Sequence, residues 1–258
     1  MSMKIKFLLL ASVFLSAISC RAPLNVAKIS PEKNISLTKD LPESQSFKNT
    51  IEPYKQEVEG KMNTKLSYTA VDLNKQGDNS NLGNLLADYT FEGADDWARK
   101  NGIPGGVDGA VINVGGIRST IGAGDILTKH VYEVMPFENE VVIVKLKGSD
   151  LKGLFDYYVK TQKNNPVSHL YIETDNDKII KGLVNGKEVV PTQDYYIATS
   201  DYLALGGDNM AFFGKGEVIS TGLRLRDLFL DKFKASPEIV APKDVRLNFK
   251  NKKNNTDG

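Results

Sequence analysis

The feature that most constrains the fold of this chain is an apolar run at residues 109–112 that ends in two adjacent glycines and Arg118. Glycine admits backbone angles closed to other residues and lets amide N–H groups approach a ligand. Arginine offers a rigid fork of donors that matches phosphate or carboxylate. Glycine pairs after strands are more often plain turns. The pattern therefore predicts a buried strand that ends either in a simple turn or in an anion site.

The first twenty residues have the layout of an export signal, with a basic start, an apolar stretch and small residues before Cys20. This arrangement resembles a bacterial lipoprotein signal, in which the cysteine is lipidated and begins the mature protein. Cys20 is the only cysteine in the chain, so it cannot form an intrachain disulfide. The alternative is an ordinary secretory signal with an incidental cysteine, because Ala17 stands where leucine is commoner. We expect lipid attachment at Cys20, which would hold the protein on a membrane as an exported cell-envelope lipoprotein, facing the periplasm or on the outer membrane.

The chain divides by composition into four parts. Residues 1–19 are the predicted lipoprotein signal peptide. Residues 20–50 are rich in Pro, Ser, Lys, Asn and Glu without a sustained period, which predicts a flexible tether. Residues 51–250 are long enough for one domain with a real core, and residues 251–258 are predicted to be a disordered tail.

The charge balance argues against a nucleic-acid partner. The chain has 33 Lys and Arg against 32 Asp and Glu, a formal net charge of +1. It has no basic stripe with interleaved aromatic residues, which is the pattern typical of nucleic-acid binding. No internal repeat of solenoid length is present.

Hydrophobic periodicity within residues 51–250 predicts a mixture of helices and strands. Helices are expected at residues 81–100, 128–134 and 221–233, and another begins at Ser149 or Asp150. Strands are expected at residues 109–114, 140–147, 169–174, 178–184, 195–199 and 245–249. Because these elements follow no strict βαβ order, we expect an α/β domain with a mixed sheet or two packed sheets.

Two further loops carry polar and aromatic side chains. One is residues 136–139, with Phe137 and Asn139, and the other is residues 200–209, with Tyr202 and Asp208. Together with Arg118, these loops contain what is needed to sandwich a flat ring and hold an anion beside it. Taken singly, each of these residues has a plainer reading as packing or as a turn.

Five motifs, in order along the chain, resemble the C-terminal domain of the 5'-nucleotidases. The resemblance covers residues 56–249. It rests on Asn81-Leu82-Gly83-Asn84, Asn113-Val114-Gly115-Gly116-Ile117-Arg118, Gly124-Asp125-Ile126, Pro136-Phe137-Glu138-Asn139 and Gly206-Gly207-Asp208. An ordered set is far more specific than any single motif. It implies a single α/β domain of this type, with mixed β-sheets flanked by helices, that binds a nucleotide or nucleoside.

The resemblance also implies which residues bind. Phe137 and Tyr202 match two aromatic residues that stack on the base, with Tyr202 standing where phenylalanine is usual. Asn139 and Asp208 match contacts to the base edge and the ribose hydroxyls. The residues around the phosphate are matched by Asn113, Gly116 and Arg118.

Three positions depart from the family pattern. Asn81 stands where the family often has a phosphate-binding arginine. Val114 replaces a small residue, which argues against a left-handed backbone there. Asn209 replaces a usual glycine, and asparagine tolerates that conformation.

Full-length relatives also carry a metallophosphatase domain whose two metals activate the attacking water. The two histidines of this chain, His130 and His169, lack metal-ligand spacing and are read as surface or packed residues. No cofactor or metal is therefore expected in this chain, and divalent metals are expected only in a partner.

Two functions remain open. One is the nucleotide-recognition subunit of a split 5'-nucleotidase, inactive until a separately encoded metallophosphatase docks. The other is a free-standing lipoprotein that binds nucleotides or nucleosides without catalysis. A structural or adhesive role for a degenerate domain is a third and weaker reading.

Overall fold

The computed structural model describes residues 41–252 continuously, together with Lys28, Ser30, Lys33, Asn34, Ser36, Thr38 and Lys39. The predicted signal peptide, Cys20 and residues 253–258 lie outside the described residues. The chain divides into two units, Met1–Asn49 and Thr50–Gly258. All the sheets and the core belong to the second unit.

Helix α2 (Gln45–Met62) crosses the boundary that was predicted between residues 50 and 51. None of its residues is buried, and ion pairs four residues apart join Lys55 to Glu59 and Lys61 to Glu57. Such pairs stabilise a helix locally. The helix α2 therefore begins inside the segment, residues 20–50, that is predicted to be a flexible tether.

The central sheet has five strands in the order β10, β4, β9, β2, β5. β2 and β9 run parallel, and the other neighbouring pairs run antiparallel. The sheet is therefore mixed, as predicted. Its strands are β2 (Gly109–Val111), β4 (Glu140–Lys147), β5 (Val167–Ser168), β9 (Asp194–Ser200) and β10 (Glu217–Arg224).

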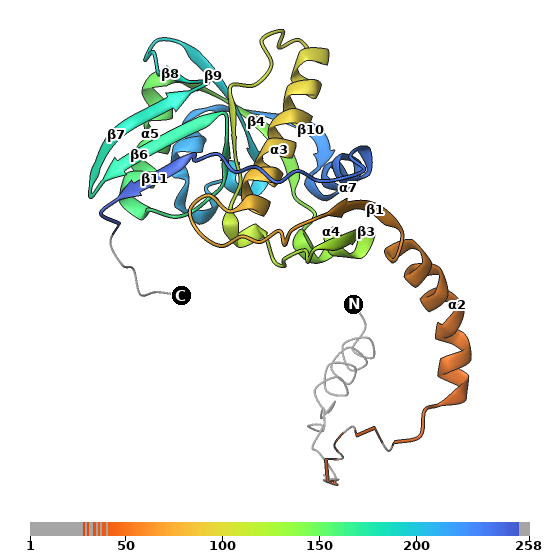
Figure 1. Ribbon diagram of the computed structural model, residues 1–258. Coiled ribbons are helices and arrows are strands. Elements are labelled where there is room, and N and C mark those ends of the chain that lie inside the picture. The colour runs from red at the N-terminus through yellow and green to blue at the C-terminus, as the bar shows by residue number, and fades with distance from the viewer. Residues whose placement is uncertain are drawn as a thin grey trace, which may run out of the picture. The chain divides into compact units, whose positions relative to one another are not determined.

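Two smaller sheets complete the β structure (Figure 1). Four strands lie in the order β11, β6, β7, β8, with β11 parallel to β6 and the remaining pairs antiparallel. β1 pairs with β3 in an antiparallel ribbon. These strands are β1 (Lys65–Thr69), β3 (Gly124–Leu127), β6 (Leu170–Asp175), β7 (Lys178–Val184), β8 (Lys187–Glu188) and β11 (Leu247–Lys250).

The helices bury both faces of the central sheet. On one face, α3 (Asn81–Lys100), α4 (Thr128–Val134) and α7 (Leu225–Ala235) pack against Ala110, Val141 and Ile143. On the other face, α5 (Gly148–Thr161) and the four-stranded sheet cover Val142 and Val144. Successive side chains of a strand point to opposite faces of the sheet. The residues of β4 therefore contribute alternately to the two hydrophobic cores. Among the described residues the other helices are short: α6 (Asp201–Ala204), η1 (Val114–Gly116), η2 (Gly207–Asn209) and η3 (Ala211–Lys215).

The predicted fold class is confirmed, and the helices at residues 81–100 and 128–134 and the strands at residues 140–147 and 178–184 have the predicted bounds. The helix predicted at residues 221–233 is wrong in its first turn. Residues 217–224 form β10, which pairs with β4, and the helix α7 begins only at Leu225. A bulge lies between Ser220 and Leu223, where Gly222 has a φ of 72°. The leucines of this segment have helical spacing, which is why the sequence predicted a helix. The first residues of the segment instead form a strand because they pair with β4.

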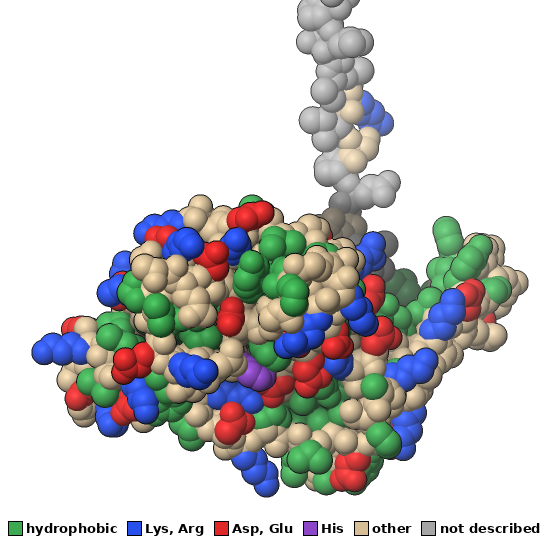
Figure 2. All heavy atoms as spheres, turned by 90° about the horizontal axis from the view of Figure 1, so that it is seen from above, with side chains coloured by type: hydrophobic (Ala, Val, Ile, Leu, Met, Phe, Trp, Pro, Cys, Tyr) green, Lys and Arg blue, Asp and Glu red, His purple; other side chains and the backbone are tan. Residues whose placement is uncertain are grey.

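Acidic and basic side chains are interspersed over the face of the molecule that Figure 2 shows. This agrees with the near balance of charge in the sequence. Within the described residues, no helix has the length and apolar character that crossing a bilayer requires.

Candidate functional site

A pocket of about 380 Å³ lies at one end of the strands of the central sheet. The parallel strands β2 and β9 end there, and β4, antiparallel to β9, begins there. Loops that are far apart in the sequence therefore meet at one place. All seven predicted site residues line this pocket: Asn113, Gly116, Arg118, Phe137, Asn139, Tyr202 and Asp208. The prediction did not include five further lining residues, Ile112, Gly115, Met135, Ser200 and Leu225.

The loop after β2 is held by a buried amide. Asn165, fully buried, accepts a hydrogen bond from the Val114 N–H at 2.9 Å, and its own amide donates to the Tyr157 hydroxyl at 2.9 Å. Gly116 lies against the Asn113 side chain, whose Oδ1 would be 2.9 Å from a Cβ added at this glycine. Only glycine fits there without displacing Asn113. Val114 has no left-handed backbone, as predicted, because residues 114–116 form the short helix η1.

Arg118 is the basic side chain of the pocket, and it is exposed. Its backbone N–H donates to Val134 O at 2.8 Å, which fixes where the side chain starts. The guanidinium donates to Gly115 O at 3.3 Å, so most of its N–H donors are not used by that contact. An arginine in this state can bind an anion at the mouth of the pocket.

Contacts from α7 hold the loop that contains Phe137 in place. Arg226, nearly buried, donates to Pro136 O at 3.1 Å and forms an ion pair with Glu138. Its guanidinium also lies over the Tyr132 ring, 4.5 Å from the centroid. The hydrogen bond from Arg226 holds the pKa of the Glu138 carboxyl below its usual range. The sequence prediction missed these contacts, since Arg226 lies 88 residues beyond Glu138.

The turn after β9 places Tyr202 and Asp208 together. The Tyr202 hydroxyl donates to Asp208 Oδ1 at 3.2 Å, and the Asp208 N–H donates back to that hydroxyl at 3.2 Å. Asp208 and Asn209 both have left-handed backbones, with φ of 52° and 66°. The tolerance expected of Asn209 is therefore confirmed. Below the turn, burial raises the pKa of Tyr157 to about 12, and the charge of Asp208 adds to this effect.

The pocket combines two uncovered aromatic rings with polar groups. Phe137 and Tyr202 come from different loops, and each is 44 % exposed although it lines a cavity. Beside them lie the amides of Asn113 and Asn139, one carboxylate and one guanidinium. Such a set can stack on a flat ring, read its polar edge and bind an anion. Within residues 41–252 and the other described positions, no three His, Cys, Asp or Glu side chains gather to hold a metal ion.

Asn81, where the family pattern often has arginine, lies outside this pocket. Its Oδ1 accepts hydrogen bonds from the backbone N–H groups of Asn74 and Leu82, at 2.8 and 2.7 Å. Its amide donates to Asp72 O at 2.9 Å. Asn81 therefore closes the loop before α3 rather than meeting a ligand. Ser80 occupies the N-cap position, but its side chain makes no capping hydrogen bond.

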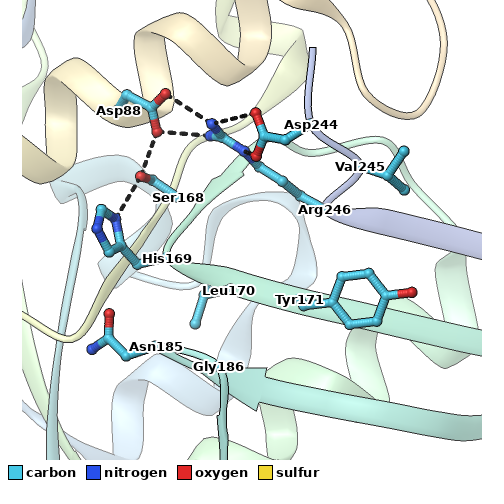
Figure 3. Close-up of a pocket in the computed structure, with 10 residues that line it drawn as sticks. All are labelled: Asp88, Ser168, His169, Leu170, Tyr171, Asn185, Gly186, Asp244, Val245 and Arg246. Carbon is cyan, nitrogen blue, oxygen red and sulfur yellow. Dashed lines mark hydrogen bonds and ion pairs between the residues drawn. The ribbon is translucent and has the colours of Figure 1, made fainter. Parts of the chain in front are cut away.

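A second pocket, of about 390 Å³, lies between α3 and the four-stranded sheet (Figure 3). In its lining, Arg246 forms a two-pronged ion pair with Asp88, at 2.7 and 2.8 Å, and another with Asp244, at 2.7 and 3.1 Å. The same guanidinium donates to the carbonyls of Asn84 and Val167. With every donor used inside the protein, this arginine has a structural role.

His169 lies at the edge of the second pocket, stacked on the Phe91 ring at 3.6 Å between centroids. The Ser168 hydroxyl donates to Asp88 Oδ1 and lies 3.0 Å from His169 Nδ1. Because the hydroxyl proton is used on Asp88, Nδ1 carries a hydrogen and donates to Ser168. His130 is likewise a local contact, since its Nδ1 accepts from the Leu127 N–H at 3.1 Å. Both histidines thus have the packed or surface roles that the sequence indicated.

The burial of His169 predicts a pH dependence of stability. Burial lowers the pKa of the imidazole, with Arg246 acting in the same direction and Asp88 opposing it. The pKa of His169 in the folded state is therefore below its value in the unfolded chain, about 6.5. The stabilisation that the neutral imidazole contributes is fully present above pH 6.5 and is lost as the pH falls through the folded-state pKa. We expect the melting temperature to fall more between about pH 7.5 and 5.5 in the wild type than in His169→Asn. Asparagine tolerates the φ of 58° at this position. Equal slopes in the two proteins would contradict the assignment.

The fold and the pocket define an α/β domain with a cavity of small-molecule size where β2 and β9 end. Residues 58–215 match the family described as 5'-nucleotidase, C-terminal domain. The chain therefore belongs to the 5'-nucleotidase C-terminal domain family.

Individual relatives agree with this assignment. The chain is 30% identical to the UshA protein of Yersinia enterocolitica over 191 aligned residues, and the alignment covers 68% of this chain and 32% of the relative. It is 30% identical over 237 residues to the trifunctional nucleotide phosphoesterase protein YfkN of Bacillus subtilis, covering 80% of this chain and 15% of that protein. The solved 5'-nucleotidase precursor of Thermus thermophilus superposes with a TM-score of 0.67 at 27% identity, covering 82% of this chain and 44% of that one. The chain thus spans less than half the length of each.

Proposed function

We propose that this chain is the nucleotide-recognition subunit of a split 5'-nucleotidase, which acts with a separately encoded metallophosphatase in nucleotide catabolism. The chain binds the base and sugar, and the partner holds the divalent metals that activate water and cleave the phosphoester. No cofactor is proposed for this chain itself. Attachment of lipid at Cys20 would keep this subunit at the membrane of the cell envelope.

The observation that carries this proposal is the convergence of Phe137, Tyr202 and Arg118 on one pocket. Two exposed rings suit a nucleobase, and a guanidinium whose donors are mostly unused suits a phosphate. The names of two of the three cited relatives support the same class of ligand, since one is called a nucleotide phosphoesterase and the other a 5'-nucleotidase precursor.

A second candidate function is a free-standing lipoprotein that binds nucleotides or nucleosides. The substitution of Asn81 for a family arginine is compatible with this reading, because Asn81 uses its side chain on the backbone of its own loop. A weak hold on phosphate suits a nucleoside binder. It equally suits a half-site in which the metals of a partner supply most of the positive charge.

Reconstitution separates the two functions. We expect the purified chain with divalent metal to release no phosphate from AMP. Addition of a metallophosphatase encoded beside it should restore release, because the metal-activated water and the nucleotide pocket are then in one complex. Colorimetric phosphate assays measure this, and the partner alone and the partner with Phe137→Ala chain are the controls.

Two results of this assay would contradict the subunit proposal. Full activity of the partner without this chain would favour the free-standing binder. Phosphate release by the purified chain alone would show that it carries its own catalytic groups. The membrane assignment has a separate check, because mass spectrometry of the mature N-terminus should find acyl groups on Cys20.

A further inference from the structure

The fully buried side chain of Asn165 contacts the first pocket from behind, through the loop that follows β2. Its Oδ1 accepts the Val114 N–H at 2.9 Å, and its amide nitrogen donates to the Tyr157 hydroxyl at 2.9 Å. The Tyr158 hydroxyl donates to the main-chain oxygen of Asn165 at 2.7 Å. Because a backbone N–H can only donate, the oxygen of the amide must face Val114. The Asn165 side chain therefore has one orientation in which both of its contacts are made.

The contact with Asn165 fixes the short helix η1, to which the Arg118 side chain is bonded. The Arg118 guanidinium donates to Gly115 O at 3.3 Å, and Gly115 belongs to η1. In the described part of the chain, residues 113–116 form one hydrogen bond to a residue beyond the loop 113–118, and that bond is the one to Asn165. A displacement of η1 would therefore move Gly115 O, and with it the guanidinium that is bonded there.

We propose that Asn165 is a positioning residue that sets the preference of the pocket for ligands with an anionic group over neutral ones. The inference rests on the proposed function and names a residue that decides between nucleotides and nucleosides. Arg118 is the one cationic side chain among the twelve residues that line the pocket, so an anionic group of a ligand pairs there. Phe137 and Tyr202 lie on other loops and can hold a neutral ligand without η1.

The test measures the binding of AMP and of adenosine to the full chain by calorimetry. Asn165→Leu keeps the branched shape of the side chain but cannot accept the Val114 N–H. It should weaken AMP binding roughly tenfold, the effect of losing one hydrogen bond between charged groups, and leave adenosine within about twofold of the wild type. In an Arg118→Met background the same substitution should change AMP binding by less than about twofold, because the group that Asn165 positions is absent.

Tyr158→Phe is the matched control. It also removes a buried hydrogen bond to Asn165, but that bond is to the main-chain oxygen and leaves the contact with Val114 intact. Both affinities should stay within about twofold of the wild type.

Tyr157→Phe is a second variant, which decides the question if melting curves show that Asn165→Leu is not folded. It removes the acceptor of the Asn165 amide, so the side chain can rotate away from Val114. AMP binding should weaken about threefold, and adenosine binding should not change.

Two outcomes would overturn the inference and leave the proposed function standing. An equal loss of AMP and adenosine affinity in Asn165→Leu would show that Asn165 supports the whole pocket rather than the place of Arg118. Unchanged AMP binding in the folded variants at Asn165 and Tyr157 would show that η1 keeps its place without this amide. Failure of the wild type to bind either ligand would instead remove the proposed function, and this inference with it.

Discussion

Replacing Arg246 with methionine is expected to lower the free energy of unfolding by about 3 kcal/mol, the scale for breaking a buried ion pair by removing one partner. The Arg246 side chain is only 10% exposed and joins Asp88 on α3 to Asp244. It also satisfies the carbonyl oxygens of Asn84 and Val167, which would lose a donor in a buried place. Urea denaturation followed by circular dichroism measures the change.

Arg224→Met is the matched control for that experiment. Arg224 also pairs with a carboxylate, that of Glu138, but their side chains are 63% and 60% exposed. Exposed pairs contribute little to stability, so the free energy of unfolding should stay within error of the wild type. A similar loss in both variants, or no loss in Arg246→Met, would show that the buried cluster does not hold α3 to the segment before β11.

Truncating either aromatic ring of the first pocket is expected to weaken nucleotide binding by about 1 to 3 kcal/mol, the range for stacking of a base on an aromatic side chain. Phe137→Ala and Tyr202→Ala each remove one ring from the pocket. In affinity this is roughly a 5- to 150-fold increase in Kd, which calorimetry with AMP, UMP and adenosine can resolve.

Leu205→Ala provides the control for the ring variants. Leu205 lies on the same turn as Tyr202, is 86% exposed and does not line the pocket. Its truncation should leave Kd unchanged. If both ring variants bind as tightly as the wild type, the stacking role assigned to Phe137 and Tyr202 is wrong, whatever the pocket binds.

The positions of the site residues were predictable because each belongs to a short motif. A glycine pair followed by arginine, or a Pro-Phe-x-Asn loop, can be recognised from a few neighbouring residues. The supports of these motifs could not be recognised in that way. Asn165 fixes the Val114 loop from 51 residues away, and Arg226 braces the Phe137 loop from α7. Neither residue has a local pattern that points to its partner.

The secondary structure was likewise predictable where the signal is local and unpredictable where it depends on distant segments. The amphipathic helix at residues 81–100 and the apolar strand at residues 140–147 were predicted because their periodicity is strong and local. β10 was mistaken for the start of a helix because its conformation depends on pairing with β4, more than 70 residues earlier. The β1–β3 ribbon likewise joins short strands from distant parts of the chain.

The sequence by itself determined the family, the α/β class and the identity of seven of the twelve residues that line the pocket. Only the tertiary structure decided that Phe137, Tyr202 and Arg118 share one cavity, because the parallel ends of β2 and β9 bring their loops to one end of the strands of the sheet. It also decided that the Tyr202 hydroxyl donates a hydrogen bond to Asp208, and that Arg246 uses its donors on groups of the protein and so has a structural role. The physical reason is that a short stretch of sequence shows which side chains a motif contains, whereas contacts between distant segments decide which of these side chains lie together.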